Sequence, residues 1–111
     1  MTLNISGPIA GYIAANLRLD LEGMMKHFLP NAVFIDNDKR HEGKEQIRKL
    51  LKEEGIAVKA VFEPDTAREE DGDVVLEGPC HGDFPGSPLR FTYRFKMEGN
   101  AIKTLETTVW A

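Results

Sequence analysis

The 111-residue sequence predicts an α+β fold, in which three N-terminal helices pack on one face of a strongly curved, mainly antiparallel sheet. Apolar residues recur at helical spacing up to residue 55. From residue 56 onward they alternate with polar residues, as side chains on a half-buried strand do. Turn signals, among them Asp71-Gly72 and Gly99-Asn100, separate the alternating runs. This length suits a single domain, residues 1–111.

Two helices are expected within the first 30 residues. The first begins at Ser6-Gly7-Pro8, because a small capping residue followed by proline marks a helix start. Its apolar stripe consists of Ile9, Ala10, Ile13, Ala14 and Leu17. Asp20 caps the second helix, which ends at Pro30. The apolar side of that helix carries Leu21, Met24, Met25 and Phe28.

A short apolar strand that follows Pro30 ends on a carboxylate. Ala32, Phe34 and Asp36 share one face of it, because side chains alternate along a strand. If that face points inward, Asp36 is a carboxylate in an apolar wall. A second interpretation is also open, in which Asp36 only accepts hydrogen bonds from the amides of the turn at Asn37.

The third helix is expected over residues 44–54, with Gly55 at its end. Strands are expected over residues 56–62, 74–82, 89–97 and 101–110. The third of these strands alternates most regularly. The side chains predicted to face the helices are Leu89, Phe91, Tyr93, Phe95 and Met97. The side chains on its opposite face are Arg90, Thr92, Arg94 and Lys96.

Composition narrows the classes of function. A net charge of −4 and a pI near 5.3 argue against nucleic acid or an anionic membrane as partner. Cys80 is the only cysteine, which excludes an intramolecular disulfide and suits the cytoplasm. We see neither a signal peptide nor an apolar run of membrane-spanning length. The three histidines lack the spacing of metal ligands, and no phosphate-binding glycine loop occurs, so no metal and no cofactor are expected.

The order of elements resembles the SnoaL-like and ketosteroid-isomerase-like branch of the nuclear transport factor 2 superfamily, over essentially the whole chain. The residues that carry the resemblance are Tyr12 in Gly-Tyr-Ile-Ala-Ala-Asn, the segment Asp20-Leu21-Glu22-Gly23-Met24, residues 28–36, and Glu42-Gly43-Lys44-Glu45-Gln46-Ile47-Arg48. The resemblance implies a cone-shaped sheet closed by the helices, with a cavity for a small hydrophobic ligand. It also implies a homodimer, since members of this superfamily commonly pair through their sheets.

The resemblance also implies site residues. Tyr12 and Asp36 stand where ketosteroid isomerases have a donor to the dienolate oxygen and the aspartate that moves a proton. Those enzymes use a protonated aspartate on a later strand as well. Here residues 89–97 contain no acid, and Tyr93 is nearest to that position, which departs from the isomerase pattern. The implied pocket residues are Phe34, Phe91, Phe95 and Trp110.

Three classes of function remain open. The first is an enzyme, an isomerase or a SnoaL-like cyclase or lyase, with Asp36 as general base and Tyr12 and Tyr93 as oxyanion donors. The second is a carrier that binds a hydrophobic ligand without chemistry. The third is a dimeric interaction protein. A phenol and a carboxylate in one cavity would favour the enzyme over the carrier.

Overall fold

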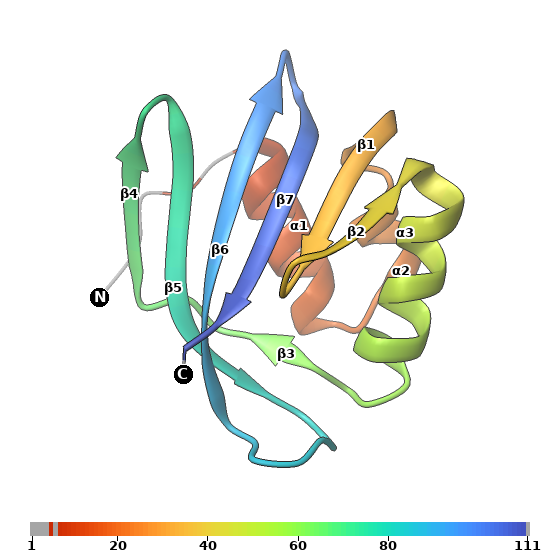
Figure 1. Ribbon diagram of the computed structural model, residues 1–111, viewed down its shortest axis with the longest axis vertical. Coiled ribbons are helices and arrows are strands. Elements are labelled where there is room, and N and C mark those ends of the chain that lie inside the picture. Colours follow the sequence, from red (N-terminus) through yellow and green to blue (C-terminus); the bar gives the residue numbers. More distant parts are fainter. Residues whose placement is uncertain (1–4, 6, 111) are drawn as a thin grey trace.

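The computed structural model describes Ile5 and residues 7–110, in which helices and a curled seven-stranded sheet form two layers (Figure 1). Ser6, the predicted start of the first helix, lies outside the described residues. The helical elements are α1 (Gly7–Leu17), α2 (Leu21–Met25), α3 (Gly43–Leu51) and the π-helical turn η1 (Lys52–Ile56). The strands are β1 (Phe28–Asp36), β2 (Lys39–Glu42), β3 (Val61–Phe62), β4 (Thr66–Glu70), β5 (Asp73–His81), β6 (Leu89–Glu98) and β7 (Ala101–Val109). None of the described helices is long and apolar enough to cross a membrane.

The sheet has the strand order β2-β1-β7-β6-β5-β3, and β4 pairs with β5 beside this path. All pairs are antiparallel except β1 with β7, which run parallel. The helices cover one side of the curled sheet (Figure 1). The predicted α+β architecture, with helices on a curved and mainly antiparallel sheet, is therefore confirmed.

Two tight turns fix the hairpins. Asn37 and Asp38 join β1 to β2 with φ values of 47° and 72°, and Asp71 and Gly72 join β4 to β5 with 53° and 83°. Two consecutive positive φ values are typical of type I′ turns, whose twist matches that of the flanking strands. The hairpin predicted at Asp71-Gly72 is confirmed, although its first strand is β4 and not residues 56–62.

The sequence-based element bounds are wrong in three places. The second helix ends at Met25. Pro30 lies within β1, in a stretch where the pairing with β7 is irregular, so its lack of a backbone N–H breaks no hydrogen bond between the strands. The third helix does not end at Gly55, because η1 carries the helical path on to Ile56. Of the strand expected over residues 56–62, only β3 pairs, since a turn with Lys59 at φ 53° precedes it.

The core lies between the helices and the inner face of β6. Phe95 is fully buried there, and Phe91, Tyr93 and Met97 pack against the same core, which confirms the predicted face of this strand. The ring of Tyr12 meets that of Phe95 edge-on, with centroids 6.0 Å apart. The predicted helical stripe is wrong at its end, because Leu17 is 52% exposed.

Asn16, beside Leu17, is turned inward and is only 7% exposed. Its side-chain amide donates to the carbonyl of Ala60 at 2.9 Å, and its carbonyl oxygen accepts from the amide of Phe62 at 2.8 Å. One side chain therefore supplies both hydrogen bonds that a neighbouring strand would otherwise give. In this way α1 fixes the segment that leads into β3.

We expect Asn16→Leu to lower the free energy of unfolding by about 1–3 kcal/mol, because buried backbone groups then lose their partners. Denaturant titration of the variant measures this loss. The matched control is Asn31→Leu, the same change at an exposed position of β1. Equal unfolding midpoints for the two variants would contradict the role assigned to Asn16.

Candidate functional site

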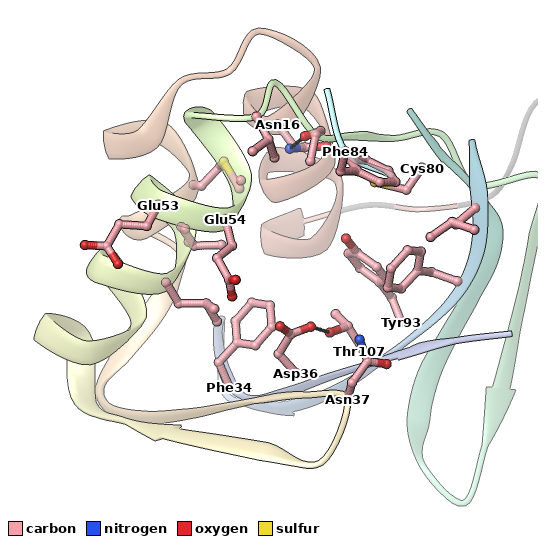
Figure 2. Close-up of a pocket in the computed structure, with 18 of the residues that line it drawn as sticks. Asn16, Phe34, Asp36, Asn37, Glu53, Glu54, Cys80, Phe84, Tyr93 and Thr107 are labelled. Carbon is pink, nitrogen blue, oxygen red and sulfur yellow. Dashed lines mark hydrogen bonds between the residues drawn. The ribbon is translucent and has the colours of Figure 1, made fainter. Parts of the chain in front are cut away.

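A cavity of about 290 Å³ lies between the helices and the inner face of the sheet, and it opens past η1. Its walls combine aromatic and aliphatic side chains with a small number of polar groups (Figure 2). The polar residues that line it are Tyr12, Asn16, Asp36, Asn37, Glu53, Glu54, Tyr93 and Thr107. A mostly apolar pocket with a few convergent polar groups is the usual form of a small-molecule site.

Asp36 is the last residue of β1, and its carboxylate lies on the cavity side next to β7 (Figure 2). The hydroxyl of Thr107 donates to Asp36 Oδ1 at 2.8 Å, because the parallel register pairs these two residues. The turn between β1 and β2 is held by Asn37 instead. The side-chain oxygen of Asn37 accepts a hydrogen bond from the amide of Val109 at 2.8 Å. Among the described residues no hydrogen bond joins Asp36 to a turn amide, which leaves Oδ2 facing the cavity without a protein donor.

Two phenols line the same cavity. Tyr12, from α1, is 2% exposed, and Tyr93 comes from the inner face of β6. Burial raises the pKa of both phenols, and the nearby Asp36 and Cys80 raise them further. Both side chains are therefore protonated donors at ordinary pH. Within the described part of the chain, neither hydroxyl has a protein hydrogen-bond partner.

Packing holds the phenols in place. The ring of Tyr93 stacks on Phe62 with centroids 3.8 Å apart and planes within 6°. Tyr12 contacts Phe28 edge-on at 5.6 Å, in addition to its contact with Phe95. Stacked and edge-on aromatic contacts restrict ring orientation, so the hydroxyls are pre-positioned.

The structure brings together most of the residues expected in the site, but not all of them. Phe34 and Phe91 line the cavity, together with Tyr12, Asp36 and Tyr93. Phe95 does not line it, since it lies fully buried behind Tyr12.

Trp110 also lies outside the cavity, and its expected pocket role is wrong. Side chains of the last strand that face the cavity are Thr107 and, two residues on, Val109, so Trp110 falls on the outer face. It is 48% exposed there, its indole N–H donates to Thr92 at 2.7 Å, and the Arg90 guanidinium lies 4.7 Å from its ring.

Sequence reasoning missed the contribution of η1. Glu53 was expected on the solvated face of a regular helix and Glu54 at the end of that helix, but both border the cavity. No sequence signal announces the π-helical turn, which changes the direction of the side chains that follow Leu51. Cys80 and Phe84 were missed as well, and burial raises the pKa of the Cys80 thiol to about 11, so it is a poor nucleophile.

The described residues contain no group of three His, Cys, Asp or Glu side chains that could hold a metal ion. The arrangement instead offers a carboxylate as proton acceptor and two protonated phenols as donors, in a pocket with apolar walls. These are the groups needed to take a proton from carbon beside a carbonyl and to stabilise the resulting oxyanion.

Solved structures of known fold match nearly the whole chain. A candidate polyketide cyclase from Sinorhizobium meliloti is 27% identical, with a TM-score of 0.87 over 95% of this chain and 96% of that one. A protein with a ketosteroid-isomerase-like fold from Catenulispora acidiphila, in complex with trimethylamine, is 17% identical, with a TM-score of 0.75 over 90% and 82%. A computationally designed 17-OHP binder is 13% identical, with a TM-score of 0.80 over 96% and 95%. No protein-family model and no curated protein sequence matches this chain.

Proposed function

The chain has the nuclear-transport-factor-2-like fold in its SnoaL-like and ketosteroid-isomerase-like form, and from that premise we propose that residues 1–111 are one domain that moves a proton on a hydrophobic, enolisable carbonyl compound. The observation that carries the proposal is the shared cavity of Asp36, Tyr12 and Tyr93. The carboxylate and the phenols come from β1, α1 and β6, so three elements distant in sequence supply one set of groups.

The roles follow from the chemistry of each group. Asp36 accepts the proton from the carbon next to the carbonyl, through the oxygen that Thr107 leaves free. Tyr12 and Tyr93 donate to the carbonyl oxygen as it gains negative charge. Fixed donors in a site that excludes water stabilise such a charge strongly. Asp36 then returns the proton to the same or to a conjugated carbon.

A general readout tests this reaction without knowledge of the final product. The purified protein is incubated in D₂O with a set of flat ketones, including ketosteroids and tetralones, and NMR follows exchange of the hydrogen next to the carbonyl. We expect exchange well above the buffer rate for at least one ketone. Ketones that bind but do not exchange would favour a ligand carrier of the same fold.

The carrier is the second candidate, and one comparison favours it. A designed protein that matches over 96% of this chain is described as a binder only. The cavity alone is sufficient for binding, whereas catalysis also requires the alignment of Asp36 with the phenols. Exchange in D₂O separates the two functions.

We expect Tyr12→Phe to slow the exchange by about 10²-fold, the lower end of the cost of losing one oxyanion donor, because Tyr93 remains. The unfolding midpoint should change little, since the Tyr12 hydroxyl has no partner among the described residues. Exchange rates of Tyr93→Phe and of the double variant measure how much each of the two phenols contributes to the rate. A double variant as active as the wild type would remove both phenols from the mechanism.

We further propose that the protein is a homodimer that pairs through the outer face of its sheet and acts in the cytoplasm. The exposed Trp110 lies on that face, whereas Arg90 and Arg94 there are already paired with Asp65 and Asp73. Trp110→Glu is expected to shift sedimentation at micromolar concentration from dimer to monomer. Leu17→Glu, at the other exposed large apolar residue, is the control. A wild-type protein that sediments only as monomer would contradict the proposal.

A further inference from the structure

The cavity is bordered by several carboxylates. Asp36, Glu53 and Glu54 belong to its lining, which includes no lysine, arginine or histidine among the described residues. None of the three acids forms an ion pair with another described residue. These carboxylates repel an anionic group placed beside them and attract a cationic one.

The two glutamates differ in direction. The carboxylate of Glu54 lies on the cavity side, towards Phe34 and Asp36, whereas that of Glu53 points away (Figure 2). Behind them, both residues border a second hollow that contains His41 and Lys49. Lys49 lines this second hollow and is not among the residues that line the cavity. The π-helical turn η1 is what brings Glu54 to the rim.

The lining of the cavity also contains a hydrogen-bond donor from α1. The Tyr12 side chain is 98% buried, and its hydroxyl faces the cavity without a protein partner among the described residues. This hydroxyl is therefore free to donate to an acceptor atom of a ligand in the cavity. Because Tyr12 and Glu54 line the same cavity, one ligand can accept a hydrogen bond from Tyr12 with one group and place another group near Glu54.

We propose that Glu54 binds a protonated amine at the rim, so that the substrate is a hydrophobic compound with a carbonyl at one end and a cationic amine at the other. The carbonyl half of this inference rests on the proposed function, and the amine half does not. Aromatic side chains of the cavity add to the attraction, because a cation is also attracted to the face of an aromatic ring. Phe34, Phe84 and Phe91 line the same cavity.

The test uses three ligands that share one apolar body and cannot enolise. They are 2-naphthylmethylamine, 2-naphthylmethanol and 2-naphthoate, which carry a positive, a neutral and a negative group. Calorimetry at low salt measures binding of each to the wild type, to Glu54→Gln and to Glu53→Gln. Glu53→Gln is the matched control, because it removes the same charge from the neighbouring residue.

We expect the amine to bind the wild type about 5-fold more tightly than the alcohol, as a partly exposed ion pair with an aromatic contribution would give. Naphthoate should bind most weakly. Glu54→Gln should abolish the preference for the amine and Glu53→Gln should largely keep it, and 0.5 M salt should weaken it. The unfolding midpoint of each variant shows that the fold is intact.

Equal affinity for amine and alcohol, no binding of the amine at millimolar concentration, or a preference that survives Glu54→Gln would each overturn the inference. Failure of the proposed function has a different signature, in which the amine preference persists but ketones show no exchange in D₂O. The two proposals are therefore tested by separate measurements.

Discussion

Asp36→Asn is expected to reduce the rate of proton exchange on a bound ketone by about 10²–10⁴-fold, the usual contribution of a general base. The amide has nearly the same shape as the carboxylate, and its oxygen still accepts the hydrogen bond from Thr107. Binding of ketones should therefore survive the substitution, and the loss should appear in kcat and not in KM. NMR exchange rates at saturating ketone measure the effect.

Asp38→Asn supplies the matched control. Asp38 is two residues further along, is exposed, and does not line the cavity, so the same loss of charge there should leave exchange unchanged. Equal rates for Asp36→Asn and the wild type on a ketone that is turned over would remove Asp36 from the mechanism.

Gly78→Ala is expected to have the largest effect on stability, a loss of about 3 kcal/mol or more, above the usual range for overpacking. A Cβ atom at this position would lie 2.5 Å from the carbonyl oxygen of Glu63 and 2.6 Å from the Cα of Pro64. Both are backbone atoms of the segment between β3 and β4, where the amide of Glu63 bonds the carbonyl of Pro79. A second bond, from the amide of Asp65 to the carbonyl of Glu77, also holds this segment beside Gly78, and the atoms in the way are backbone atoms that cannot rotate aside.

Thermal and denaturant unfolding measure the loss. Gly55→Ala is the control, because its added Cβ would have no neighbour within 4 Å and its φ is not in the positive range. Alanine at such a site is expected to be neutral or slightly stabilising. Similar midpoints for the two variants would show that the segment between β3 and β4 moves aside at little cost.

Periodicity in the sequence was sufficient for the fold class and for the inner face of β6. Alternation from Leu89 to Met97 is strong because the inward side chains face the core or the cavity, and a one-residue slip would bury Arg90 and Arg94. The type I′ turn at Asp71-Gly72 was predictable for a local reason, since few dipeptides adopt two positive φ values in succession.

The parts of the site that sequence could not predict depend on tertiary contacts. From the sequence, Asn16 is only a polar residue on a helix. Its buried side chain is explained by its hydrogen bonds to the backbone of Ala60 and Phe62, which the sequence does not indicate. Glu54 owes its direction to η1, which no propensity indicates. Trp110 was assigned to the cavity on resemblance, whereas the register of β7 with β6 puts it on the opposite face.

The strand β7, which contributes Thr107 to the cavity, is the last of the seven described strands to be synthesised. In the finished sheet β7 lies between β1 and β6, so each of these strands has an open edge on that side until residues 101–109 arrive. Thr107 meets Asp36 across 71 positions, and contacts between such distant positions form slowly. Before β7 pairs, the chain therefore has open edges on β1 and β6 to which other chains can add. The cavity can bind a ligand only after β7 has joined the sheet.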